Sequence, residues 1–139
     1  MKSMTARQCM TTDLRVVSPD LNVWSALAIM NQGDIRHLLV MDGDRLVGVL
    51  SNRDYRRILE QARPDGSVQH IRDYSVRQIM TRKEHVVTVG PDTPLLDVAE
   101  LIVSRRIGCV PVVDNLDRPV GILTQKDVMA ALIDVCRSR

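Results

Sequence analysis

The chain repeats itself: landmarks of its first half return in the same order in its second half. Arg7–Thr11 (RQCMT) returns as Arg77–Thr81 (RQIMT), 70 positions later. Gly48–Asp54 (GVLSNRD) returns as Gly121–Asp127 (GILTQKD), 73 positions later. The small drift in spacing needs only short insertions in loops, which cost little free energy. Because self-similarity at a nearly constant period is typical of duplicated structural units, the sequence predicts two similar units in tandem.

Apolar periodicity divides each half into the same elements, a short helical turn followed by β-α-β-β-α. The first half shows a turn at Arg7–Met10, a strand at Arg15–Val17, a helix at Val23–Gln32 stopped by Gly33, strands at His37–Met41 and Leu46–Leu50, and a helix presenting Tyr55, Ile58, Leu59 and Ala62. The second half shows a turn at Val76–Met80, a strand at Val86–Val89, a helix at Leu95–Arg105, strands at Cys109–Val113 and Val120–Leu123, and a helix presenting Met129, Leu132, Ile133 and Cys136. Asp42–Asp44 is a hairpin signal, and Arg63–Ser67 is predicted as the loop between the repeats.

These elements predict a mixed α/β (α+β) fold. Residues 1–66 would form the first repeat with its N-terminal segment, and residues 67–139 the second. Neither repeat has enough residues to bury its sheet alone, so we expect the two to pack as a pseudo-twofold pair, with Trp24 in the core or between the repeats. The last helix is apolar over much of its surface, which indicates a further burial partner and predicts a homodimer.

Composition excludes several classes of function. The chain has 139 residues, of which 45% are hydrophobic and 26% charged, as in ordinary globular proteins. The net charge of +2 is too weak and too scattered to indicate a nucleic-acid surface. No apolar run resembles a secretory signal or reaches membrane-spanning length. Three cysteines without a CxxC favour a reducing compartment over disulfides or zinc, so we expect a cytoplasmic protein without a metal site.

The repeated Gly-to-Asp stretch has a structural interpretation. Ser51-x-x-Asp54 and Thr124-x-x-Asp127 stand where a strand is predicted to end and a helix to begin. This spacing is typical of a capping box, in which the hydroxyl accepts from an amide of the first turn and the acid accepts from the amide of the cap residue. Each cap would stabilise its helix by about 1 kcal/mol.

The same geometry suits a ligand. A helix N-terminus attracts phosphate, and a Ser or Thr hydroxyl can donate to a phosphate oxygen. An Asp one turn into the helix has two acceptor oxygens for the paired hydroxyls of a ribose. Gly48 and Gly121 would let a ligand approach the strand backbone closely. The stretch alone does not separate the cap from the binding site.

Four motifs in the same order, each present twice, give the chain a strong family resemblance. They are RQxMT, VV(S/T), I(R/G)xx(L/P)VxD and G-aliphatic-aliphatic-(S/T)-x-x-D, with Val16–Ser18 matched to Val86–Thr88 and Ile35–Asp42 to Ile107–Asp114. In this the chain resembles a pair of CBS domains, also called a Bateman module, over about Ala6 to Ile133. The SNRDYRR stretch is most similar to small stand-alone CBS-pair proteins.

The resemblance implies a non-enzymatic regulatory module that binds AMP, ADP, ATP, NAD(H) or S-adenosylmethionine, with no obligatory cofactor. Asp54 and Asp127 would hold ribose, Ser51 and Thr124 would meet phosphate, and Arg53 and Lys126 would be nearby cations. The remaining site residues would line the base: Val17, Ser18 and Pro19, then Val87, Thr88 and Val89 on one side, and Arg36, His37 and Leu38, then Gly108, Cys109 and Val110 on the other.

The two predicted clefts differ in charge. The first repeat places Arg36-His37 where the second has Gly108-Cys109, and Leu39 where the second keeps Pro111. The first also carries Arg53, Arg56 and Arg57. We expect the first cleft to favour a phosphate-rich ligand.

Two other functions remain open at this point. The chain could be a structural dimerisation or protein-interaction module whose clefts are vestigial, in which case the repeated stretch is only a helix cap. It could be a nucleic-acid-binding regulator, which the near-balanced charge disfavours. Catalysis has the least support, because no nucleophile–base pair or metal set is visible around His37, His70 or His85. The regulated partner protein is unknown.

Overall fold

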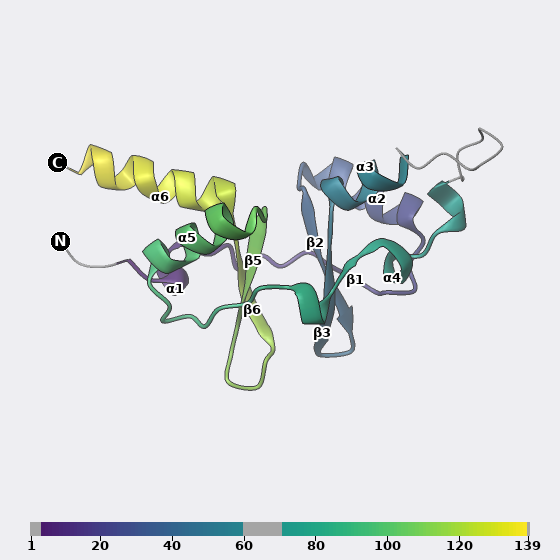
Figure 1. Ribbon diagram of the computed structural model, residues 1–139, viewed down its shortest axis with the longest axis horizontal. Helices are drawn as coiled ribbons and strands as arrows, with labels where there is room; N and C mark the ends of the chain where they lie inside the picture. Colours follow the sequence, from purple (N-terminus) through teal and green to yellow (C-terminus); the bar gives the residue numbers. More distant parts are fainter. Residues whose placement is uncertain (1–3, 60–70, 139) are drawn as a thin grey trace. The chain divides into compact units, whose positions relative to one another are not determined.

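The computed structural model describes residues 4–59 and 71–138 of the chain (Figure 1). They form two compact units. The repeat-1 unit is Arg15–Val86, and the repeat-2 unit combines Met1–Leu14 with Val87–Arg139. The compact units therefore exchange the leading segments of the sequence repeats, and the N-terminal RQxMT motif belongs to the unit that holds the second repeat. The predicted loop Arg63–Ser67, with Ala62 and His70, lies outside the described residues.

A four-stranded sheet organises the repeat-1 unit, in the order β1-β2-β3-β4. The strands and helices are β1 (Val16–Val17), α2 (Val23–Gly33), β2 (His37–Asp42), β3 (Arg45–Ser51), α3 (Asn52–Leu59), α4 (Val76–Ile79) and β4 (Thr81–Arg82), with 3-10 turns at Ile71–Asp73 and Lys83–His85. β1 runs parallel to β2, whereas the other pairs are antiparallel. β4 was not predicted, and it carries the end of the second RQxMT motif.

The chain reversals of this unit follow local chemistry. Gly43 has a φ of +63° in the β2–β3 turn, a conformation that glycine adopts without steric cost. At the start of α2, the Asn22 side chain accepts from the Trp24 amide at 2.8 Å. Gly33 was predicted to stop α2, but it is the last helical residue. The left-handed position is Asp34, with a φ of 50°, because a short polar side chain tolerates that region.

The repeat-2 unit is built around a two-stranded sheet. Its elements are α1 (Ala6–Cys9), α5 (Leu95–Arg105), β5 (Cys109–Val113), β6 (Pro119–Thr124) and α6 (Gln125–Arg137). Figure 1 shows α5 and α6 beside the β5–β6 hairpin, and both helices contact this hairpin. The strand predicted at Val86–Val89 is reduced to a single parallel bridge between Val89 and Val112.

Each unit has its own aliphatic core, as a sequence without Phe requires. The repeat-1 core includes the buried side chains Val23, Met30, Leu38, Val40 and Leu50. The repeat-2 core includes Ala6, Val98, Val110, Val112 and Leu123. Trp24, predicted to lie in the core or between the repeats, is 50% exposed.

The exchanged segments are held by the same contacts in both units. The Arg77 amide donates to the Pro19 carbonyl at 2.8 Å, and its guanidinium pairs with Asp20 at 3.2 Å. In the repeat-2 unit, the Arg7 amide donates to the Pro91 carbonyl at 2.9 Å and the guanidinium pairs with Asp92 at 3.1 Å. Each RQxMT motif therefore binds the Pro-Asp turn that leads into the first long helix of its unit.

Candidate functional site

The repeated Gly-to-Asp stretch forms the predicted helix cap in both units. In the repeat-1 unit, Asp54 Oδ2 accepts from the Ser51 amide at 3.0 Å and from the Ser51 hydroxyl at 3.1 Å. In the repeat-2 unit, Asp127 Oδ2 accepts from the Thr124 amide at 2.9 Å and from the Thr124 hydroxyl at 3.1 Å. The structural interpretation of the stretch is therefore correct, and any binding role must coexist with it.

A second contact on each Asp comes from the exchanged segment. Thr11 donates its hydroxyl to Asp127 Oδ1 at 3.0 Å, and Thr81 donates to Asp54 Oδ1 at 3.5 Å. Sequence reasoning missed both threonines as site residues. The signal was present, because Thr11 and Thr81 are the matching final residues of the two RQxMT motifs.

The two aspartates differ in their surroundings. Asp54 is buried, and its Oδ1 also accepts from the Arg57 guanidinium at 3.3 Å. Burial raises the pKa of Asp54 above its ordinary 3.8, against the opposing effects of the Ser51 donors, the Arg57 charge and the Thr81 hydroxyl. Asp127 is only half-buried, and the residue that matches Arg57 is Ala130. Asp54 is thus more enclosed than its counterpart.

The β2–β3 register brings Arg36 and His37 to the same end of the sheet as this cap. His37 lies opposite Ser51, and the Asn52 amide donates to the Arg36 carbonyl at 3.1 Å. Burial, followed by the charges of Arg53 and Arg36, lowers the pKa of His37 from its ordinary 6.5. Leu38 is fully buried, so it can line a site only through its backbone.

The repeat-2 unit has the same arrangement with less charge. Cys109 lies opposite Thr124, and the Gln125 amide donates to the Gly108 carbonyl at 3.3 Å. Cys109 and Val110 are buried, whereas Lys126 is exposed next to the capping Asp127. Within each unit, therefore, the structure gathers the predicted residues of the second strand and of the helix start.

The predicted base-lining residues of the first strand are not equivalent in the two units. Val17 pairs with Val40, whereas Val89 pairs with Val112, so the structural match is Val17 with Val89. The predicted match of Val16–Ser18 with Val86–Thr88 was therefore displaced by two residues. The residues that correspond to Val87–Val89 are Arg15–Val17. Because β1 runs parallel to β2, Ser18 and Pro19 follow Val17 toward the C-terminal end of β2, away from His37.

Sequence reasoning thus missed Arg15 at this end of the sheet. The Arg15 carbonyl accepts from the Leu39 amide at 3.0 Å, two residues along β2 from His37. The sequence did contain the signal, because the spacing of 72 between Pro19-Asp20 and Pro91-Asp92 also relates Arg15–Val17 to Val87–Val89.

The glycines that open the repeated stretch face methionine side chains. A β-carbon at Gly48 would lie 2.6 Å from Met80 Sδ and 2.6 Å from the Thr81 carbonyl oxygen. A β-carbon at Gly121 would collide with Met10, whose Cγ would be 2.7 Å away. Close packing of the RQxMT methionine on the strand explains both glycines without a ligand. We had expected these glycines to let a ligand approach the strand backbone.

The sequence model of the CBS domain matches the chain twice, over residues 6–61 and 76–134. The chain belongs to the CBS-domain family. A solved structure of the CBS domain pair of protein MJ0100, in complex with 5′-methylthioadenosine and S-adenosyl-L-methionine, superposes with a TM-score of 0.81 at 25% identity. That match covers 96% of this chain and 98% of the MJ0100 chain, so this CBS pair has the mixed α/β architecture of a whole CBS domain pair.

Two curated relatives are similar to this CBS pair over only part of their own length. Protein MJ1225 of Methanocaldococcus jannaschii, described as a putative archaeal homologue of γ-AMPK, is 31% identical over 86% of this chain and 44% of its own length, and its structure gives a TM-score of 0.83. Inosine-5′-monophosphate dehydrogenase of the same organism is 30% identical over 89% of this chain but only 23% of its own length. The similarity to that enzyme is confined to a part of it.

Within residues 4–59 and 71–138, no helix has the length and apolar character needed to cross a membrane. The same residues form no group of three or more histidine, cysteine or acidic side chains suited to a metal ion.

Proposed function

We propose that this CBS pair is a regulatory sensor that binds an adenosine-containing ligand, such as AMP, ADP, ATP, NAD(H) or S-adenosylmethionine, and has no catalytic role. The observation that carries the proposal is the repeated Asp cap. In each unit a carboxylate is fixed at a strand-to-helix junction by hydroxyl and amide donors. Ligand binding would change the packing of the repeats or of the subunits, and a partner protein in the cytoplasm would read this change.

The proposed roles follow from the donors and acceptors at each junction. Asp54 and Asp127 would accept from the ribose hydroxyls at Oδ1, the oxygen that the cap does not use. The ribose would displace the Thr81 and Arg57 donors from Asp54 and the Thr11 donor from Asp127. Ser51 and Thr124 would turn their hydroxyls from the carboxylate to a phosphate oxygen. The N-termini of α3 and α6 favour negative charge at the same place.

The backbone beside each junction would contact the base. In the repeat-2 unit these residues are Val87–Val89 and Gly108–Val110, and in the repeat-1 unit Arg36–Leu38 with Arg15–Val17. Ser18 and Pro19 are therefore less suited to this role than the sequence suggested. Gly48 and Gly121 would contribute through close packing of the methionines.

The repeat-1 unit is proposed to take the more highly phosphorylated ligand. Arg36, His37 and Arg53 are cationic or able to become so, whereas their counterparts are Gly108, Cys109 and Lys126. Burial and then the charges of Arg53 and Arg36 lower the pKa of His37, and an anionic ligand would offset the two arginine charges. The repeat-2 unit would accept a ligand of lower negative charge.

The exposed apolar side chains of α5 and α6 support a homodimer as part of this proposal. Leu96, Val103, Met129 and Leu132 are each more than half exposed. Surfaces of this kind mark association sites more often than free surfaces. A nucleic-acid partner stays disfavoured by the net charge of +2.

Calorimetric titration with AMP, ATP, NADH and S-adenosylmethionine tests the proposal on the wild type and on Asp54→Ala/Asp127→Ala. We expect at least one ligand to bind the wild type below the millimolar range and the double variant to lose that binding. Because these substitutions also remove helix caps, Gln78→Ala serves as the matched control. It breaks the capping box of α4, where the Ser75 amide donates to Gln78 at 2.8 Å, and should leave binding intact.

Equal binding by the wild type and the double variant would reject the site. No binding at all, together with a lower melting temperature in the double variant, would favour the second candidate function, a structural interaction module. The capping hydrogen bonds, which are complete without a ligand, are the observation that keeps this candidate open.

A further inference from the structure

The carboxylate proposed to hold the ribose meets a different donor at Oδ1 in each unit. In the repeat-1 unit, Asp54 Oδ1 accepts from the Arg57 guanidinium at 3.3 Å. In the repeat-2 unit, Asp127 Oδ1 accepts from the Thr11 hydroxyl at 3.0 Å. The residue that matches Arg57 at the spacing of 73 is Ala130, whose side chain has neither charge nor donor. A ribose that binds at Oδ1 therefore competes with a cation in the repeat-1 unit and with a neutral hydroxyl in the repeat-2 unit.

The α3 helix places Arg57 within reach of this carboxylate but leaves it able to move. Residues three apart are neighbours on a helix surface, so the Arg57 side chain reaches back to Asp54. The Asp54 side chain is 9% exposed, whereas that of Arg57 is 62% exposed. The guanidinium can therefore leave the carboxylate by rotation of its own side chain, while the buried acid stays in place.

Arg57 also lies beside the place proposed for the ligand phosphate. Ser51 donates its hydroxyl to Asp54 Oδ2 at 3.1 Å, while Arg57 donates to Oδ1 of the same carboxylate. A phosphate that meets the Ser51 hydroxyl would be close enough for the guanidinium to turn to it. Guanidinium groups bind phosphate oxygens through charge-assisted and often bidentate hydrogen bonds. A phosphorylated ligand would therefore give Arg57 a new partner in place of the one that its ribose takes.

We propose that Arg57 makes the repeat-1 site selective for 5′-phosphorylated adenosine compounds over adenosine itself, whereas the repeat-2 site, with Ala130, accepts both. The inference rests on the proposed function and names the residue that sets ligand choice at one of its two sites. An uncharged nucleoside would displace Arg57 without replacing its charge-assisted hydrogen bond, whereas a nucleotide would exchange that bond for one to its phosphate. The neutral Thr11 and Thr81 hydroxyls would be displaced alike by both ligands, so they would not discriminate.

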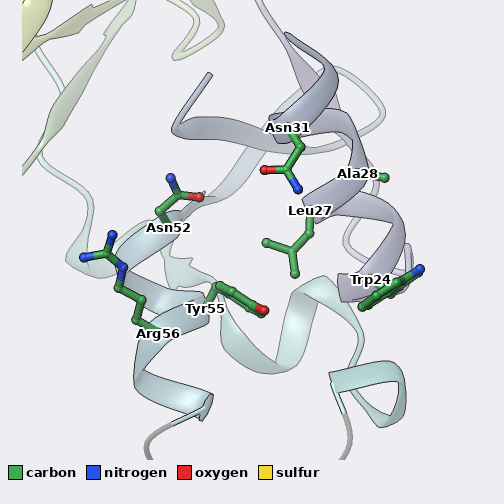
Figure 2. Close-up of a pocket in the computed structure, with 7 residues that line it drawn as sticks. All are labelled: Trp24, Leu27, Ala28, Asn31, Asn52, Tyr55 and Arg56. Atoms are coloured by element: carbon green, nitrogen blue, oxygen red, sulfur yellow. The ribbon is translucent and has the colours of Figure 1, made fainter. Parts of the chain in front are cut away.

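The neighbouring Arg56 separates this local effect from the general charge of α3. Arg56 lines a groove between α2 and α3, together with Leu27 and Tyr55 (Figure 2). Residues two apart on a helix do not face each other, so Arg56 and Asp54 point to different sides of α3. Arg56→Ala therefore removes the same charge as Arg57→Ala but keeps the contact with Asp54.

Calorimetric titration with AMP and with adenosine tests the selectivity, because the two compounds differ only by the 5′-phosphate. Asp127→Ala removes the repeat-2 site, so the repeat-1 site is measured alone. In this background Arg57→Ala should weaken AMP and strengthen adenosine by about threefold or more each, so the ratio of their dissociation constants should change about tenfold, as for one charge-assisted hydrogen bond. Arg57→Lys should retain part of the preference for AMP, since it keeps the charge but not the planar fork. Arg56→Ala should change the ratio by less than about twofold, because the field of an exposed charge is screened.

Transfer of the arginine to the other unit gives an independent test. Ala130 is exposed in α6, so Ala130→Arg should fold as the wild type does. With Asp54→Ala removing the repeat-1 site, Ala130→Arg should raise the preference for AMP over adenosine at the repeat-2 site by about threefold or more. Ala130→Gln, which adds a polar side chain without charge, should leave the preference unchanged. This arm keeps the test valid if Arg57→Ala impairs folding, which its melting temperature would show.

The outcomes separate the failure of the selectivity from the failure of the proposed function. Equal losses of AMP and adenosine affinity in Arg57→Ala would show that Arg57 only supports the Asp54 carboxylate, and the selectivity would be wrong. An unchanged ratio in Arg57→Ala, or in Ala130→Arg if Arg57→Ala does not fold, would also overturn it. Binding of another adenosine compound at the repeat-1 site without binding of AMP would overturn the selectivity while the sensor function stands. If AMP, ATP, NADH and S-adenosylmethionine all fail to bind the wild type, the proposed function and the inference fail together.

Discussion

The Thr11 hydroxyl donates to Asp127 Oδ1 at 3.0 Å, although the two residues lie 116 positions apart in the chain. Thr81 and Asp54 form the corresponding contact at 3.5 Å in the other unit. Each threonine ends an RQxMT motif, and each aspartate ends a Gly-to-Asp stretch. The two clearest repeats of the sequence therefore meet in space, and the meeting point is the candidate ribose-binding carboxylate.

Replacing Thr11 with Val should lower the stability of the protein while leaving its shape intact. The substitution removes one hydroxyl donor from Asp127 and keeps the branched side chain. We expect the free energy of unfolding to fall by about 1 kcal/mol, as for a single hydrogen bond. Urea denaturation measures the change.

Thr11→Ser is the matched control, because it retains the hydroxyl. It should keep most of the stability lost in Thr11→Val. Equal losses in the two variants would show that the methyl group matters and that the hydrogen bond to Asp127 contributes nothing.

The close packing of Gly48 and Gly121 predicts a difference between the two strands. A β-carbon at Gly48 meets both the Met80 side chain and the backbone oxygen of Thr81, whereas the nearest atoms at Gly121 belong to the Met10 side chain. Alanine at either position should destabilise the protein by about 1–3 kcal/mol through overpacking. Thermal and urea unfolding measure this loss.

Shortening the methionine should help only one of these variants. Met10→Ala should recover part of the stability lost in Gly121→Ala, since a side chain can be removed. Met80→Ala should not rescue Gly48→Ala, because the Thr81 backbone remains in place. Gly90→Ala is the control and should be tolerated, as its β-carbon would have no neighbour closer than 4.0 Å. Rescue in both pairs would contradict the packing described here.

The sequence predicted the elements well and their partners poorly. The helix predicted at Leu95–Arg105 has those bounds in α5, and the β2–β3 hairpin lies where the turn residues Asp42–Asp44 indicated. These features depend on local periodicity and turn chemistry. Periodicity also located two copies of the RQxMT segment, but it carries no information on which copy packs against which repeat. The exchange of leading segments and the strand β4 were therefore missed.

The candidate site shows the same division. Ser51, Asp54, Thr124 and Asp127 were found because cap spacing is local. Val16–Ser18 was matched to Val86–Thr88 because each stretch has two valines followed by a hydroxyl residue, at a spacing of 70. The strand pairing instead relates Val17 to Val89, at a spacing of 72. Trp24 was misplaced for a related reason. Apolar residues cover most of α2, so periodicity alone did not show that Trp24 lies away from the buried face of this helix.

His37 should make the stability of the unliganded protein depend on pH. Its pKa is lowered in the folded protein by burial and then by Arg53 and Arg36, so the unfolded chain binds protons more readily. Stability should therefore fall as the pH decreases below the ordinary value of 6.5 and toward the lower folded value. Urea denaturation at a series of pH values measures the slope.

Substitutions assign this slope to one histidine. His37→Gln should flatten the dependence below pH 6.5, whereas His85→Gln, at an exposed position, should not. A phosphorylated ligand that binds the repeat-1 unit should favour the charged imidazole. Its affinity should then increase as the pH falls, and this increase should vanish in His37→Gln. An unchanged slope in His37→Gln would exclude the histidine as its source.

Removal of residues 1–12 should destabilise the second repeat of the sequence more than the first. These residues supply the buried Ala6, the Met10 side chain against Gly121, and the Met4 carbonyl that accepts from the Leu95 amide at 2.8 Å. All of these contacts lie in the repeat-2 unit. Amide hydrogen exchange should therefore accelerate in β5, β6 and α6 well before it does in β2 and β3.

A point variant separates loss of this packing from loss of the exposed ion pair. Arg7→Ala removes the ion pair with Asp92, in which the Arg7 side chain is 61% exposed and the Asp92 side chain 83% exposed. The free energy of unfolding should therefore fall by less than about 1 kcal/mol. The free peptide of residues 1–14, added to the shortened chain, should restore slow exchange in β5 and β6, because its contacts form without the covalent link. Acceleration in β2 and β3 first would mean that the N-terminal segment stabilises the repeat to which it belongs in sequence, and that the exchange of segments is wrong.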